Sequence, residues 1–247
     1  MIRNLDTAFR LLFFQNKIRL VKKAVLGLLL TGCIFLLCSC ASSMRPLTSR
    51  VKVTDVTDIQ KFETFSYISF IAKGNRAMYN DSISAMSKTL FIETLAANPN
   101  IPVTGAINVL DTNVLIRVEK EVNYLMSVVD KKRDVTRMKI TPVLDSLLER
   151  EGKRFGLLTI TTGFSRAPGN YGTEVTKGAA IGILTLGMYY QVPVKAESTM
   201  YAMVVDAKEN NIAFFKKVSK LDKEPLDKAV LTKQIHQLFN GYFWYTW

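Results

Sequence analysis

Hydrophobic and polar positions divide the chain after residue 50 into short strand-like runs and longer runs with helical spacing. Runs rich in aromatic and β-branched residues predict strands at 62–71, 101–109, 155–162, 197–205 and 211–218. Apolar residues three and four positions apart predict helices at 83–97, 111–129, 141–152 and 224–239. This order predicts a single α+β domain, in which helices pack against one mixed or antiparallel sheet.

The predicted helix ends are marked by residues with known capping chemistry. Asn80-Asp81-Ser82 and Asp111 offer side chains that cap a helix start, and Thr141-Pro142 places proline at the first helical position. Glu224-Pro225 predicts the start of the last helix in the same way. Within 111–129 the apolar residues step by three and four, which predicts one buried face: Leu115, Val118, Val122, Leu125 and Val129.

A different pattern precedes the domain. Lys22-Lys23 is followed by an apolar run of 14 residues from Ala24 to Leu37, too short for the ~20 residues that span a bilayer. The run ends in Leu37-Cys38-Ser39-Cys40, which resembles the lipobox of bacterial lipoproteins, although Cys at the second place departs from the usual Ala or Ser. The resemblance implies cleavage before Cys40 and lipidation of its sulfur. The alternative is an uncleaved signal anchor.

These signals divide the chain into three parts. Residues 1–39 are predicted to be the signal peptide, 40–50 a lipidated tether, and 51–247 one periplasmic domain. Two or more acyl chains anchor a protein stably in a membrane, whereas one does so only marginally. No acidic residue directly follows Cys40, and in lipoproteins of this kind that implies the periplasmic face of the outer membrane.

Charge and cysteine content argue against nucleic-acid binding and against sites that depend on cysteine. The net charge is +12, and because residues 1–39 hold six basic residues and one acidic residue, the part from Cys40 onward carries +7. The basic residues are scattered, apart from Lys131-Lys132-Arg133 and Lys216-Lys217, so nucleic acid is a poor candidate partner. The three cysteines are Cys33, Cys38 and Cys40, so the predicted domain has no disulfide framework, thiolate metal site or cysteine nucleophile.

A second resemblance rests on the run from Thr141 to Val218. A helix (TPVLDSLLEREGK), a strand (FGLLTITT), a glycine-rich segment and a hairpin (MYAMVVDAKENNIAFFKKV) follow one another. This layout resembles periplasmic α/β lipoproteins such as the globular part of the curli-secretion channel lipoprotein and the small lipoproteins that support cell-wall synthases. It covers about a third of the chain. The resemblance implies a role in assembly or scaffolding, generally without catalysis.

Candidate sites for chemistry are few. His236 is the single histidine and lies in a predicted helix, where neither metal ligands nor a catalytic triad can be assembled around it by spacing. Gly163-Phe164-Ser165-Arg166-Ala167 superficially resembles a nucleophile elbow, but Pro168-Gly169-Asn170 prevents the helix that such an elbow needs. The glycines between 163 and 187 form no phosphate-binding motif. We therefore predict no catalytic, cofactor-binding or metal site, and Cys40 is the one site residue assigned.

Two apolar stretches allow more than one interpretation. Gly178–Tyr190 has no charge over thirteen residues and is interpreted as a buried helix or a self-covering loop, with membrane insertion as the alternative. The C-terminal run 241–247 holds five aromatic residues and is interpreted as part of the core, with an interaction patch as the alternative.

The sequence therefore predicts an outer-membrane-anchored periplasmic lipoprotein. It acts as a non-catalytic binding or assembly factor for an envelope protein or polymer, or in a homo-oligomer. The alternative is a subunit of an oligomeric pore that inserts residues 178–190. Carboxylate-based catalysis is a third hypothesis, since Asp and Glu residues are available but spacing alone does not pair them.

Overall fold

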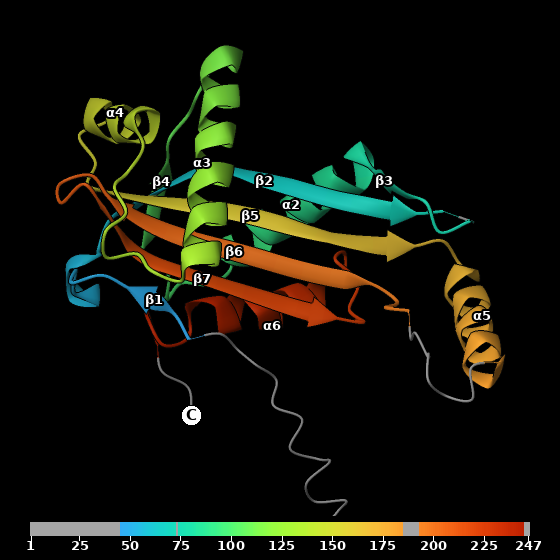
Figure 1. Cartoon of the computed structure of the whole chain (residues 1–247). Coiled ribbons are helices and arrows are strands. Elements are labelled where there is room, and N and C mark those ends of the chain that lie inside the picture. The colour runs from blue at the N-terminus through green and yellow to red at the C-terminus, as the bar shows by residue number, and fades with distance from the viewer. Residues whose placement is uncertain (1–44, 73, 185–192, 245–247) are drawn as a thin grey trace, which may run out of the picture. The chain divides into compact units, whose positions relative to one another are not determined.

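The computed structural model describes residues 45–72, 74–184 and 193–244. These residues form one mixed sheet with five α-helices and a short 3-10 helix, which confirms the predicted α+β class (Figure 1). The strands are β1 (Leu47–Thr48), β2 (Ile59–Ile71), β3 (Ala77–Tyr79), β4 (Val103–Ala106), β5 (Phe155–Arg166), β6 (Glu197–Asp206) and β7 (Asn211–Leu221). The helices are η1 (Val53–Asp55), α2 (Asp81–Ala96), α3 (Thr112–Lys132), α4 (Pro142–Arg150), α5 (Asn170–Leu184) and α6 (Lys228–Phe239).

The sheet is built around four long strands in the order β7-β6-β5-β2. β5, β6 and β7 follow one another as antiparallel neighbours, whereas β2 and β5 are parallel and are joined through β3, α2, β4, α3 and α4. β3 and β4 both pair with β2, and β1 pairs with β7. The sheet therefore begins at Leu47, inside the range predicted as the tether.

Side-chain caps fix where three of the helices begin. Asn80 accepts a hydrogen bond from the Ile83 amide at 2.9 Å, and Asp111 accepts one from the Asn113 amide at 2.7 Å, as the sequence predicted. The last helix begins at Lys228, three residues after the predicted start at Glu224-Pro225. The reason is Asp227, whose carboxylate accepts from the first free amides of that helix.

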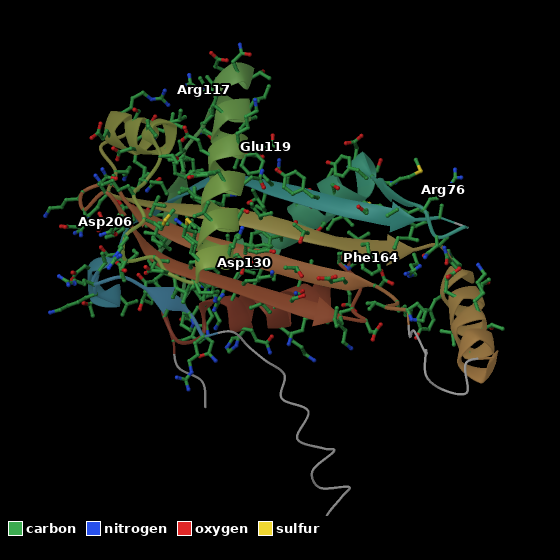
Figure 2. The ribbon with its side chains drawn as sticks, viewed as in Figure 1. Arg76, Arg117, Glu119, Asp130, Phe164 and Asp206 are labelled. Atoms are coloured by element: carbon green, nitrogen blue, oxygen red, sulfur yellow. The ribbon has the colours of Figure 1, made fainter. Side chains whose placement is uncertain are left out.

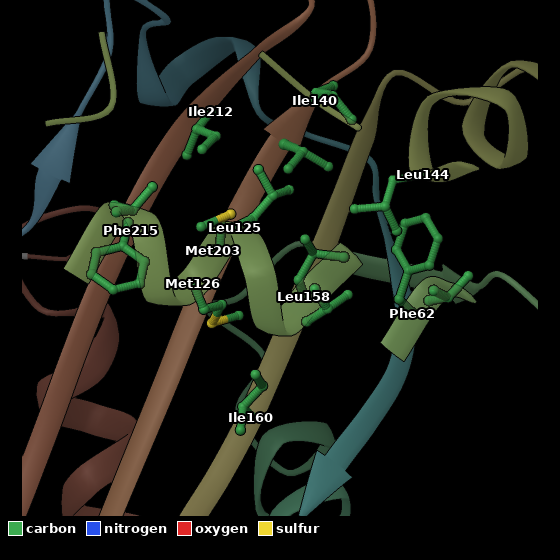
Figure 3. Packing of buried hydrophobic residues seen from close by; sticks show 14 of the residues in the cluster. Phe62, Leu125, Met126, Ile140, Leu144, Leu158, Ile160, Met203, Ile212 and Phe215 are labelled. Atoms are coloured by element: carbon green, nitrogen blue, oxygen red, sulfur yellow. The ribbon is translucent and has the colours of Figure 1, made fainter. Parts of the chain in front are cut away.

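Helices cover both faces of the sheet. On the face that we call the front, α3 and α4 pack over Phe62, Leu158, Met203 and Phe215 (Figures 1 and 3). On the back, α2 and α6 cover a second core, which takes the alternate residues of the same strands, including Leu157 and Phe214. Burial on both sides explains why the strands contain near-continuous apolar runs. Four of the five residues predicted as the α3 stripe are fully buried: Val118, Val122, Leu125 and Val129.

The buried face of α2 differs from the apolar pattern in its sequence. Met86 is 55% exposed, whereas Ser84 and Ser87 are buried beside Phe91. The Ser84 hydroxyl accepts a hydrogen bond from the Ile68 amide at 2.9 Å, so it joins α2 directly to the backbone of β2. Small side chains let the helix approach the strand closely, and the longer Met86 is left on the outside.

The C-terminal aromatic residues are partly in the core. Tyr242 is buried and stacks on Phe214 with ring centroids 4.4 Å apart, and Phe239 lies against the same ring at 5.9 Å. For Tyr242 this confirms the interpretation as core packing. Residues 245–247 lie outside the described residues.

Truncating the buried stripe of α3 tests how much the front core contributes to stability. We expect Leu125→Ala to lower the free energy of unfolding by about 2–5 kcal/mol, because it opens a cavity where the side chain is 1% exposed. Ile116→Ala on the same helix removes a side chain that is 43% exposed and should cost less than about 0.5 kcal/mol. Chemical denaturation measures both; equal losses would show that the helix does not pack as described.

Candidate functional site

Part of the front face of the sheet carries no helix. α3 crosses the strands near the start of β5, and toward the end of β5 no helix lies over this face in Figure 1. Beyond the core, most residues on this face are polar or aromatic, although Ile71 and Leu221 at the ends of β2 and β7 are aliphatic. We call this surface the open face: Tyr67, Ser69, Thr162, Phe164, Glu197, Thr199, Tyr201, Lys217 and Ser219.

Strand pairing arranges the open face in rows. Tyr67 is paired with Thr162, Thr162 with Thr199, and Thr199 with Ser219, so one row crosses four strands. The next row contains Ser69, Phe164 and Glu197. Paired side chains on one face lie about 4.5–5.5 Å apart, so hydroxyls, an aromatic ring and a carboxylate are neighbours on one surface.

The first half of α3 borders the open face through Tyr67. Its hydroxyl donates to Glu119 Oε1 at 2.6 Å and accepts from Asn123 Nδ2, also at 2.6 Å. Burial and the Glu119 carboxylate raise the pKa of Tyr67 well above its usual range, so the hydroxyl remains protonated. Its ring and hydroxyl are therefore held in one position.

The end of α3 borders the open face through Lys217. The Lys217 ammonium donates to Asp130 Oδ2 at 2.8 Å and lies 5.1 Å from the centre of the Tyr201 ring. Burial alone would lower the pKa of Lys217, but its contacts with Asp130 and Tyr201 raise the pKa overall. Figure 2 shows Glu119 and Asp130 along α3, with Phe164 farther along β5.

The Glu197 carboxylate forms hydrogen bonds with two hydroxyls of the open face. The hydroxyls of Thr199 and Ser219 lie 2.9 and 3.1 Å from Glu197 Oε1, and 2.7 Å from each other. This group joins β6 to β7 on the side facing away from the back core. Thr199 is buried, so the Glu197 carboxylate and the Ser219 hydroxyl are the parts of this group that a binding partner could contact.

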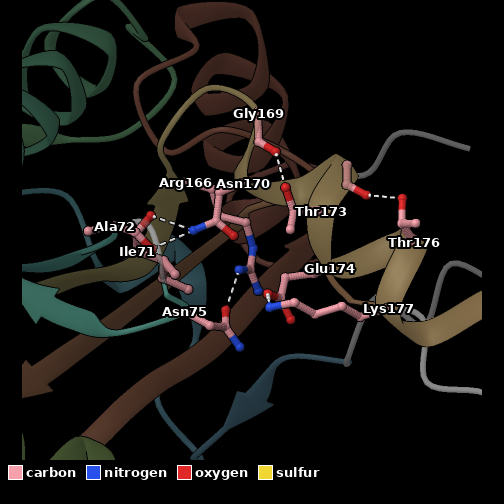
Figure 4. A network of polar contacts seen from close by, with 11 residues as sticks. Ile71, Ala72, Asn75, Arg166, Gly169, Asn170, Thr173, Glu174, Thr176 and Lys177 are labelled. Atoms are coloured by element: carbon pink, nitrogen blue, oxygen red, sulfur yellow. Dashed lines mark hydrogen bonds and ion pairs between the residues drawn. The ribbon is translucent and has the colours of Figure 1, made fainter. Parts of the chain in front are cut away.

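An arginine network closes the far end of the open face. Arg166 donates from Nε to the Val194 carbonyl at 2.8 Å and from Nη1 to Asn75 Oδ1 at 2.6 Å, and it lies over the Phe164 ring. Asn170, the first residue of α5, donates to the carbonyl of Ala72 (Figure 4). The network ties the end of β5 to the loop after β2 and to the start of α5.

Gly163 permits the close approach of β5 and β6 beneath this surface. A Cβ at position 163 would lie 2.0 Å from the Glu197 carbonyl oxygen, and the residue has φ +155°. Any side chain would therefore push apart the strands that carry Phe164 and Glu197.

The sequence-based candidates fall elsewhere. Residues 163–166 belong to strand β5, so Ser165 does not stand on a strand-to-helix turn. The expectation that Pro168-Gly169-Asn170 prevents a helix is wrong, because α5 begins at Asn170. His236 is exposed on α6, with its ring 5.3 Å from the Trp244 ring. Cys40 lies outside the described residues. Of the apolar segment 178–190, residues 178–184 form the end of α5 and the remainder lies outside them.

Sequence reasoning missed the residues of the open face, because their grouping depends on strand pairing. One signal was present: along β6 and β7, apolar residues give way to hydroxyl and charged residues on alternate positions, as in Lys217 and Ser219. In residues 45–72, 74–184 and 193–244 no group of three or more His, Cys, Asp or Glu side chains is placed to hold a metal ion. Nor does this part of the chain include a helix long and apolar enough to cross a membrane.

Comparison with known proteins gives no family. No family model and no curated protein matches the sequence. Among solved structures, the PelC dodecamer from Paraburkholderia phytofirmans is similar at 7% identity with a TM-score of 0.37, over 82% of this chain and 97% of that one. A single-residue variant of that dodecamer has a TM-score of 0.35 at 7% identity, over 79% and 93% of the two chains. Scores at this level do not assign a function to the chain.

Replacing Gly163 tests whether the close approach of β5 and β6 matters. We expect Gly163→Ala to destabilise the domain by about 1–3 kcal/mol, because the new Cβ meets backbone that cannot rotate away. Gly172→Ala is the matched control: it lies in α5 with no atom near its Cβ position, and it should leave stability equal or slightly higher. Thermal unfolding followed by circular dichroism distinguishes them, and similar melting temperatures for the two variants would contradict the expected strain.

Proposed function

We propose that this chain is a lipid-anchored protein of the bacterial cell envelope and acts as a non-catalytic binding or assembly factor. The lipobox-like Leu37-Cys38-Ser39-Cys40 supports the anchor, and the position of Cys40 would hold the domain on the periplasmic face of the outer membrane. The proposed role in binding is supported mainly by one observation. Polar and aromatic side chains line the open face on four adjacent strands, and hydrogen bonds fix them.

The open face has the chemistry of a recognition surface. Rings such as Tyr67, Phe164 and Tyr201 supply large contact area at a small cost in conformational entropy, and their neighbours supply hydrogen bonds. Because Tyr67 and Lys217 are already held by Glu119 and Asp130, a partner would not have to order them on binding. We assign this surface to an envelope partner.

The anchor is tested by acyl labelling. We expect Cys40→Ser to abolish incorporation of a labelled fatty acid and to release or mislocalise the protein, because Cys40 is the proposed attachment point. Cys38→Ser is the control, since Ser is common at that place in the lipobox, and it should remain labelled. If Cys40→Ser lost the label yet kept its normal membrane fractionation, a signal anchor would replace the lipoprotein assignment.

The open face is tested by crosslinking in intact cells. A photoreactive phenylalanine analogue in place of Phe164 should give a discrete adduct with another envelope component, identified by mass spectrometry, because Phe164 belongs to the proposed surface, between Ser69 and Glu197. The same analogue in place of Thr232, exposed on α6 behind the sheet, should give none.

Two results would count against this assignment. Equal adducts at both positions would mean that contact is random. An adduct at position 164 with a second copy of this chain would favour the oligomeric alternative over a separate partner.

A further inference from the structure

A cavity of about 760 Å³ lies at the end of the domain where β5 begins and where β6 turns into β7. Its size falls within the range of about 300–1,000 Å³ found for ligand sites. Four separate segments line it: Ser49–Asp55 around β1 and η1, the loop after α3, the residue before β5, and the β6–β7 turn. Asp206 and Phe164 lie on opposite sides of α3 in Figure 2, so this cavity is distinct from the open face.

Arg154 is a fixed hydrogen-bond donor in this cavity. Its Nε and Nη2 donate to the two carboxylate oxygens of Asp206 at 2.9 and 2.7 Å, and Asp206 is fully buried. The guanidinium carbon also lies 4.6 Å from the centre of the Phe155 ring. A guanidinium has five N–H donors, so three remain after this bidentate contact, and about a third of the side chain is exposed.

Two further arginines line the cavity without such partners. Arg50 and Arg137 are exposed, and neither makes a salt bridge or hydrogen bond within the part of the chain that the structure describes. Arg137 does attract Asp134 electrostatically, and this attraction contributes to lowering the pKa of Asp134. They come from segments 87 positions apart in the sequence, so the fold brings them together around Arg154. Guanidinium groups match carboxylates and phosphates, which they can bind with two parallel hydrogen bonds.

The cavity is not uniformly basic. Asp55 and Glu209 also line it, and both attract Arg154 electrostatically. Asn211 lines it as well, but its Oδ1 is fully buried and is not presented to the cavity. Asp55 and Glu209 are exposed, so water hydrates their carboxylates in the free protein. A ligand that displaces this water must supply hydrogen-bond donors in its place. A bare anion offers no such donor.

We infer that this cavity binds an anionic, hydroxyl-rich ligand of the acidic sugar class. The carboxylate or phosphate of the ligand lies against Arg50, Arg137 and Arg154, while its hydroxyls donate to Asp55 and Glu209. The inference does not rest on the open face, so the crosslinking experiment above can fail without affecting it.

Titration of the full-length protein in detergent tests the assignment, with glucuronic acid as the acidic sugar, glucose as its neutral counterpart and inorganic phosphate as an anion without a sugar ring. We expect glucuronic acid to bind at least tenfold more tightly than glucose or phosphate. Arg50→Gln combined with Arg137→Gln should weaken glucuronic acid binding at least tenfold. Because both side chains are exposed and unpaired, the melting temperature should not change.

The matched control is Arg76→Gln combined with Arg117→Gln, which removes the same charge far from the cavity (Figure 2). This control should bind glucuronic acid as the unmodified protein does. The inference is overturned if the control weakens binding equally, because the effect would then be general charge attraction. It is also overturned if glucose or phosphate binds as tightly as glucuronic acid, or if the folded protein binds none of the three.

Discussion

The crossing of α3 over the sheet determines what the front face can do. A helix with its side chains is about 10–12 Å across, whereas a strand of 13 residues such as β2 extends about 43 Å. One helix therefore covers only part of that length, and α4 covers the sheet near the start of β5. The strands continue beyond α3. Their front side chains there are not covered by a helix.

The side chains change at the place where the helix stops. Along β5 the front residues pass from Leu158 and Ile160 to Thr162, and along β7 Phe215 is followed by Lys217. The back face of the same strands stays under α2 and α6, so its residues remain buried for longer. The contacts of α3 with Tyr67 and Lys217 lie along this boundary, and they hold the helix where the apolar surface ends.

The sequence predicted the elements better than it predicted their arrangement. Local signals were sufficient for the stripe of α3 and for the caps at Asn80 and Asp111, because these interactions join residues within one or two turns. The buried face of α2 was not evident from the sequence. Ser84 lies on that face and accepts a hydrogen bond from Ile68, sixteen residues away. The same limit applies to both candidate sites. Arg154 and Asp206 are 52 positions apart, and hydrophobic periodicity carries no information about such a pair.

The two surfaces differ in how their charges are balanced, and this difference determines what each can bind. On the open face Lys217 is paired with Asp130, so a partner that covers this part of the face would not bury an unpaired charge. In the cavity, Asp206 is paired with Arg154, while Arg50 and Arg137 make no salt bridge among the described residues and can contact an anionic ligand. A surface with internal pairs suits a broad, nearly neutral contact, and unpaired guanidiniums suit an anion. Both kinds of contact are thus available in one domain, on either side of α3.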